Sequence, residues 1–139
     1  MFGMTKKQFV KKSKNCLKDT GVELLIIREI FSKEKTGKFA EYEAYKQLEN
    51  VRKNMEDIFF KYESLKPPVK CKALHRKILN SLIIIQEAVV LNTEYLLLIQ
   101  EGSEELAQEK YKKSFNELEK FRDRFRELSQ ELDVYLARR

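Results

Sequence analysis

The chain has 139 residues, enough for one domain, and its four glycines and two prolines leave little room for short strands and turns. We therefore expect one mostly helical domain spanning residues 1–139. The formal net charge is +6, but six of the 28 basic residues lie among the first eighteen, where no acid occurs. The other 22 basic residues balance 22 acids, which argues against a dedicated nucleic-acid-binding domain with an evenly positive surface.

Between residues 5 and 32, small and apolar residues recur at steps of three and four, the period of a helix with one buried side. Thr5 and Gln8 form a capping-box pattern at its start. Gly21 lies within the pattern, and because the apolar positions stay in phase across it, we expect one continuous or slightly bent helix. The inward positions are Phe9, Ser13, Cys16, Leu17, Thr20, Leu24, Ile27 and Phe31.

Three further helices are expected at residues 39–65, 69–100 and 104–137. Pro67 and Pro68 end the second helix and open the third, and so short a connection requires antiparallel neighbours. Gly102 ends the third helix and Ser103 caps the fourth. Four long helices with short connections predict an all-α, up-down-up-down four-helix bundle of antiparallel helices.

Cellular location is predicted from what the sequence lacks. Cys16 and Cys71 form no CxxC or CxH pattern, which argues against a structural metal site or a disulfide framework. The first apolar run, residues 22–31, contains charged residues and does not match the core of a secretory signal. Residues 82–99 have the length of a membrane span, but two glutamates, a glutamine and an asparagine make their insertion costly. We expect a cytoplasmic protein with reduced thiols and no transmembrane segment.

Motifs of catalysis are not found in the sequence. His75 is the single histidine, which excludes the paired Glu-x-x-His motifs of a di-metal carboxylate centre. No P-loop, GxGxxG, HExxH or nucleophile elbow occurs. We therefore expect no enzyme activity and no catalytic, cofactor-binding or metal-binding residue, and we assign His75 a satisfied or half-exposed structural position.

The third predicted helix carries more apolar residues than one core-facing side requires. The surplus residues are Ile83, Ile84, Val90, Leu91, Leu97 and Leu98. A monomeric bundle exposes a polar side of each helix, so this surplus indicates a protein interface, with a homodimer or a helical partner covering it, or an ordinary core surplus. Glu87 and Glu94 on the same helix fit a solvated stripe, or else a buried polar group that sets register or binds a cation or the basic first helix.

The N-terminal lysines are the second candidate surface: Lys6, Lys7, Lys11, Lys12, Lys14 and Lys18. They can contact an anionic membrane or nucleic-acid phosphates, although a solvated lysine face is the favoured account of them. The favoured interpretation is a non-enzymatic, self-associating protein-interaction module. The alternative is a peripheral binder of anionic surfaces, membrane or nucleic acid, through these lysines, and a small apolar ligand between helices is a third possibility.

A set of short motifs carries one resemblance. The segments are 65–68 (LKPP), 74–75 (LH), 78–79 (IL) and 101–103 (EGS). Together, over residues 60–135, they resemble uncharacterised helical-bundle domains of Gram-positive bacterial proteins, which place a Pro-Pro break before a helix with a Leu-His or Ala-His pair. The resemblance implies a bacterial helical bundle and no known activity. Many such domains are exported or lipid-anchored, whereas this sequence has no lipobox or signal core.

Overall fold

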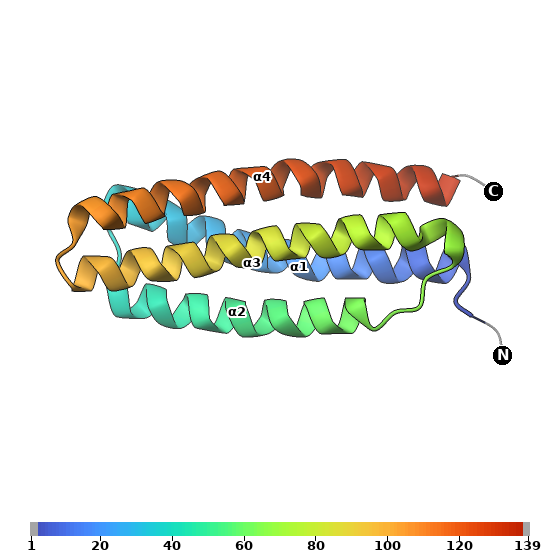
Figure 1. The fold of residues 1–139 in the computed structure, drawn as a ribbon, viewed down its shortest axis with the longest axis horizontal. Helices are drawn as coiled ribbons and strands as arrows, with labels where there is room; N and C mark the ends of the chain where they lie inside the picture. The colour runs from blue at the N-terminus through green and yellow to red at the C-terminus, as the bar shows by residue number, and fades with distance from the viewer. Residues whose placement is uncertain (1–2, 138–139) are drawn as a thin grey trace.

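Four long helices make up most of the computed structural model, which describes residues 3–137 save the side chain of Leu136 (Figure 1). They are α1 (Lys6–Thr36), α2 (Glu41–Glu63), α3 (Lys72–Gln100) and α4 (Glu104–Ala137), and a 3-10 turn, η1 (Val69–Cys71), leads into α3. The described residues contain no strand. Successive helices run in opposite directions, so the predicted all-α, up-down-up-down four-helix bundle is confirmed (Figure 1).

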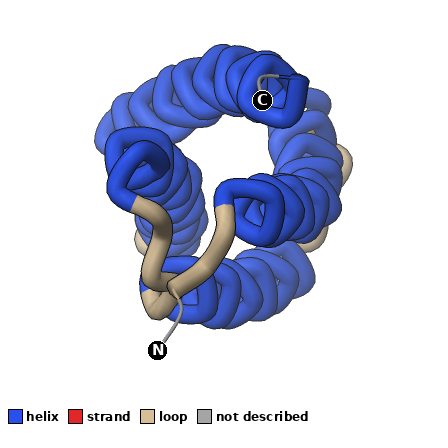
Figure 2. The backbone as a smooth tube through the Cα atoms, turned by 90° about the vertical axis from the view of Figure 1, so that its right-hand side faces the viewer, coloured by secondary structure: helices blue, strands red, loops and turns tan. Residues whose placement is uncertain are grey.

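Seen along its long axis, the bundle is a ring of four helices (Figure 2). Each helix packs against its neighbours in sequence, most extensively α3 against α4, and α1 closes the ring against α4. Contact between α1 and α3 is slight, because these two helices lie at opposite corners. The outer sides of α1 and α3 therefore point away from each other.

The start of α1 follows the predicted capping box. The hydroxyl of Thr5 accepts from the backbone N–H of Gln8 at 3.1 Å, and Oε1 of Gln8 accepts from the N–H of Thr5 at 2.9 Å. The helix continues through Gly21, as predicted, but ends at Thr36 rather than near residue 32. The predicted end, near residue 32, is the position where the apolar stripe ends. The structure instead places Glu34 at the next inward position and ends the helix at Gly37, whose φ of 72° is the left-handed conformation that glycine adopts readily.

The other boundaries lie close to the predicted ones. Helix α2 begins at Glu41, two residues after the predicted start, and ends at Glu63, before the Pro67-Pro68 break. Gly102, with a φ of 80°, follows the end of α3, and its N–H donates to the carbonyl of Ile99. The short connections therefore act as the local sequence predicts.

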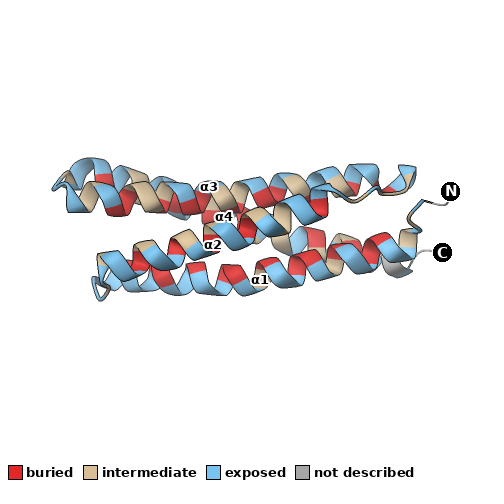
Figure 3. Ribbon diagram, turned by 90° about the horizontal axis from the view of Figure 1, so that it is seen from below, coloured by how far each residue is buried: buried red, intermediate tan, exposed pale blue. Residues whose placement is uncertain are grey.

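The core occupies the inner side of every helix, while exposed positions follow the outer sides (Figure 3). All eight inward positions predicted on the first helix are buried. His75 is half-buried against Phe9 and Tyr62, and its Nε2 lies 2.9 Å from the backbone oxygen of Tyr62. The satisfied structural position predicted for His75 is therefore confirmed.

Candidate functional site

The outer face of α3 exposes three large apolar side chains at one spacing. Ile83 is 50% exposed, Val90 44% and Leu97 43%. They are seven residues apart, close to two helical turns, so they form one stripe about 21 Å long along the helix. These three residues, which we call the α3 stripe, are half of the interface predicted from sequence.

The other half of that predicted interface turns partly inward. Ile84 and Leu98 are half-buried and pack against the core, and Leu91 is also half-buried. Each follows a member of the α3 stripe by one residue, which rotates its side chain by about 100° around the helix. Ile84, for example, lines a hollow shared with Leu128 of α4. The six surplus apolar residues of α3 are thus divided between the α3–α4 contact and the outer face.

Charges beside the α3 stripe are segregated along the helix. Glu87 and Glu101 are exposed, and Glu94 forms a 2.8 Å ion pair with Lys110 of α4 while its side chain remains 42% exposed. Glu87 is therefore solvent-exposed, as the solvated-stripe interpretation expects, whereas Glu94 is half-exposed and its Oε2 is buried against Lys110. Exposed Arg76 lies toward the other end of α3, so this face is basic at its start and acidic toward its end.

The N-terminal lysines do not form one patch. Lys7, Lys11, Lys12 and Lys18 are exposed. Lys6 is half-buried with its Nζ 5.5 Å from the centre of the Tyr135 ring, and Lys14 pairs with Asp133 of α4 at 2.9 Å. Lys12 turns toward α2, where it lines a hollow. The predicted six-lysine contact therefore reduces on the outer side of α1 to Lys7, Lys11 and Lys18, the last of which also borders a hollow between α1 and α4.

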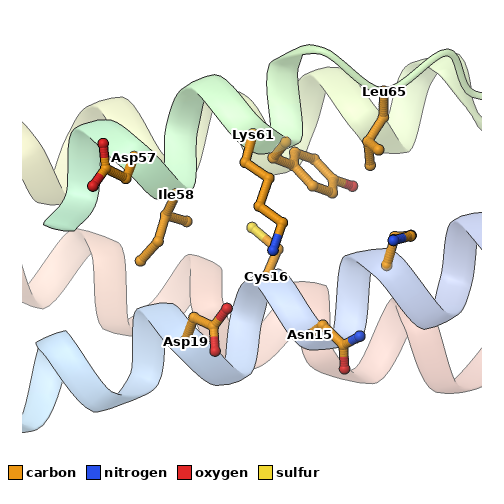
Figure 4. Close-up of a pocket in the computed structure, with 9 residues that line it drawn as sticks. Asn15, Cys16, Asp19, Asp57, Ile58, Lys61 and Leu65 are labelled. Atoms are coloured by element: carbon orange, nitrogen blue, oxygen red, sulfur yellow. The ribbon is translucent and has the colours of Figure 1, made fainter.

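A hollow of about 290 Å³ lies between α1 and α2 (Figure 4). Cys16, Ile58, Tyr62 and Leu65 supply its apolar lining, and the charged residues around it are Lys12, Asp19, Asp57 and Lys61. Lys61 extends from α2 toward the α1 side of the hollow. Two lysines and two aspartates leave this rim with no net charge, so it favours neither an anion nor a cation.

The polar groups in this hollow are poor candidates for covalent chemistry. Burial raises the pKa of the Cys16 thiol to about 12, so the thiolate is scarce at neutral pH. Burial also raises the pKa of Tyr62, whose hydroxyl lies 2.6 Å from the hydroxyl of Ser13. Cys16 and Cys71 are both buried and free. The hollow can hold a small apolar group, but these side chains offer it no activated nucleophile.

A buried polar cluster joins three helices near the end of α1. Glu34 is 6% exposed and Asn92 is fully buried. The Nδ2 of Asn92 donates to Oε1 of Glu34 at 2.8 Å and approaches the hydroxyl of Ser114 on α4 at 3.4 Å. Burial raises the pKa of Glu34 to about 8, opposed by the Asn92 hydrogen bond. Among the described residues no group of three or more His, Cys, Asp or Glu side chains is placed to hold a metal ion.

This cluster was missed by sequence reasoning, although its residues follow the helical period. Glu34 lies seven residues after Ile27, and Asn92 lies seven after Ile85, both of which are buried. A polar residue at an inward heptad position is the signal that identifies both. Glu87 and Glu94, which sequence reasoning singled out, lie on the outer face instead.

The segment Val69–Gln100 is long and apolar enough to cross a membrane by length and composition. In the bundle, 39% of its most apolar window is buried. The core helix of a bundle passes the same test, so length and composition do not separate the two roles. The absence of a transmembrane segment stays a prediction.

Comparison of the chain with protein-family models, curated proteins and solved structures gives no match. The resemblance to helical domains of Gram-positive bacteria therefore stays a prediction.

Proposed function

We propose that this protein is a non-enzymatic interaction module that self-associates through the α3 stripe. The observation that carries the proposal is the exposure of Ile83, Val90 and Leu97 at successive seven-residue intervals. A seven-residue interval is the repeat of one of the two seam positions in helices that pair along their length, and the other seam position here is polar, with Glu87 and Glu94. Covering them with a second copy removes their apolar surface from water, which favours association.

The charges on α3 favour one orientation of the two copies. In an antiparallel, two-fold pairing centred on Val90, Ile83 of one copy faces Leu97 of the other. This arrangement brings the basic end around Arg76 toward the acidic end around Glu101, while near the two-fold axis it sets Glu87 of one copy close to Glu94 of the other. Parallel pairing would instead place like charges side by side, which opposes association.

Sedimentation velocity, from low micromolar to submillimolar concentration, tests this proposal. The wild-type chain is expected to convert from monomer to dimer as concentration rises. The variant Val90→Glu places two carboxylates at the two-fold axis and is expected to remain monomeric over the same range. Because Val90 is exposed in the monomer, the substitution should leave the helical circular dichroism unchanged.

Val22→Glu is the matched control, since it makes the same substitution at an exposed valine on α1, at the opposite corner of the bundle. It should dimerise like the wild type. A wild-type chain that stays monomeric at every concentration, or dimers that Val22→Glu weakens as much as Val90→Glu does, would contradict the proposal.

A further inference from the structure

The outer face of α1 carries an apolar patch that sequence periodicity did not reveal. Val22 is 57% exposed, Leu25 65% and Ile26 37%. Their spacing of three and four residues places them next to each other on adjacent turns. They occupy the middle of a helix of 31 residues, about 46 Å long, whose outer side faces away from the bundle.

The exposed lysines of α1 lie on the same side of the helix. Lys7, Lys11 and Lys18 precede Val22 and Leu25 at steps of four, seven, four and three residues, which keeps all five within about 60° around the helix axis. The outer face of α1 therefore carries three lysines followed by the apolar patch of Val22, Leu25 and Ile26.

The acidic side chains between Lys6 and Ile26 of α1 point away from the outer face. Between Lys6 and Ile26 only Asp19 and Glu23 are acidic. Glu23 is buried and accepts a hydrogen bond from Asn54 of α2 at 2.5 Å, and Asp19 lines the hollow toward α2. The lysines on the outer face therefore have no acid beside them between residues 6 and 26, and the exposed acid of this face, Glu29, lies one turn beyond Leu25 and pairs with Lys33 at 3.2 Å.

We propose that the outer face of α1 binds an anionic lipid surface, with Lys7, Lys11 and Lys18 at the headgroup phosphates and Val22, Leu25 and Ile26 in the interface. A lysine-rich helix face that also presents aliphatic side chains is the pattern of helices lying in the plane of a membrane. The three aliphatic side chains favour a lipid surface over nucleic acid, which is bound through phosphates, base edges and aromatic stacking.

A second copy of the same face is a poorer occupant on charge grounds. Parallel pairing of two α1 helices would bring each lysine near its counterpart. Antiparallel pairing would bring Lys11 and Lys18 toward the end that carries Arg28, Lys33 and Lys35, where Glu29 is the exposed acid and is already paired with Lys33. Both orientations oppose positive charge to positive charge, whereas phosphates of a lipid surface neutralise it.

The binding surface is independent of self-association. Since α1 and α3 lie at opposite corners, a dimer formed through the α3 stripe leaves both α1 faces uncovered. Lipid binding is therefore expected of monomer and dimer alike. Lipid binding and self-association can each be disrupted without the other.

Fluorescence with lipid vesicles tests the proposal directly, because the chain contains no tryptophan. The variant Leu25→Trp carries a single indole in the apolar patch. Adding vesicles of phosphatidylcholine with phosphatidylglycerol should shift its emission to the blue, and pure phosphatidylcholine vesicles should not. Leu97→Trp, on the α3 stripe, is the matched control and should show no shift. An unshifted Leu25→Trp spectrum, or an equal shift in Leu97→Trp, would overturn the proposal.

Co-sedimentation with the same vesicles measures the contribution of each part of the face. Val22→Glu and the double variant Lys11→Glu, Lys18→Glu should each bind about tenfold more weakly or worse. Val90→Glu, which targets the α3 stripe, should bind like the wild type even if self-association fails. If Val22→Glu binds vesicles as tightly as the wild type, or the lysine variant loses affinity for generic RNA but not for vesicles, lipid is not the ligand of this face.

Discussion

Asn92 donates a 2.8 Å hydrogen bond from Nδ2 to Oε1 of Glu34, and both side chains are buried. The remaining oxygens of the pair, Oε2 of Glu34 and Oδ1 of Asn92, have no hydrogen-bond partner. A proton on Oε2 turns the carboxyl into a donor, and one further hydrogen bond to Oδ1 would then satisfy both oxygens. The raised pKa of Glu34, about 8, means that this proton is mostly bound at neutral pH.

The protonation of Glu34 makes stability depend on pH. The pKa rises from 4.5 to about 8 on folding because burial disfavours the charged carboxylate. The contribution of Glu34 is therefore full below pH 4.5, falls as the pH rises, and is lost above about pH 8. The loss is at most about 5 kcal/mol, since one pKa unit corresponds to about 1.4 kcal/mol.

Glu34→Gln tests this dependence, because its amide can accept from Nδ2 and donate to Oδ1 of Asn92 without titrating. Urea unfolding of both proteins at several pH values gives the difference in their free energies of unfolding. We expect the free energy of unfolding of the variant to increase relative to that of the wild type as the pH rises. The increase should level off above about pH 8. Two curves that stay parallel across this range would show that Glu34 does not titrate as described.

The buried hydroxyls of Ser13 and Tyr62, 2.6 Å apart, join α1 to α2. Tyr62→Phe removes the hydroxyl of Tyr62 and leaves the buried hydroxyl of Ser13 without this hydrogen-bond partner. The free energy of unfolding should therefore fall by about 1–2 kcal/mol. The double variant Ser13→Ala, Tyr62→Phe should be less destabilised than the sum of the single variants. Urea unfolding of the three variants measures the coupling, and strictly additive effects would show that this hydrogen bond contributes nothing.

Gly21 inside α1 and Gly37 at its C-terminal cap should respond to alanine with opposite signs. At Gly21 a Cβ would lie 3.6 Å from Cζ of Phe125, an ordinary van der Waals contact, so Gly21→Ala should stabilise the helix interior by about 0.5–1 kcal/mol. At Gly37 the φ of 72° is unfavourable for alanine, so Gly37→Ala should destabilise by about 1 kcal/mol. Thermal unfolding of both variants gives the two signs. Equal shifts in the same direction would contradict this account of α1.

Cysteine cross-linking distinguishes the orientations of the proposed dimer. Native Cys16 and Cys71 are buried, so an exposed cysteine introduced on α3 is the accessible thiol. In the antiparallel arrangement Val90→Cys lies at the two-fold axis and should form a disulfide between copies on mild oxidation. Ile83→Cys should do so only when mixed with Leu97→Cys, as judged on non-reducing gels. Efficient cross-linking of Ile83→Cys alone would indicate parallel pairing.

The positions and directions of the helices could be predicted from local signals in the sequence. The capping pair Thr5 and Gln8 marks where α1 begins, and the Pro67-Pro68 break separates α2 from α3 whatever the rest of the chain does. The inward stripe from Phe9 to Phe31 was also recognised, because apolar and polar residues contrast clearly around that helix. The end of α1 was misplaced since a carboxylate, Glu34, occupies an inward position usually filled by an apolar residue.

The sequence predicted only part of each candidate surface, and the reason is the same on α1 and α3. Residues 82–85 of α3 are all apolar, so periodicity does not say that Ile83 faces water while Ile84 turns toward α4. On α1, the run 24–27 conceals that Leu25 and Ile26 point outward beside the lysines. Helical period and turn residues act within a few residues of chain, so they determine the number, order and direction of the helices. The rotation of each helix depends on side chains packed from distant segments, and that packing selects the faces that meet solvent and the polar residues that meet the core.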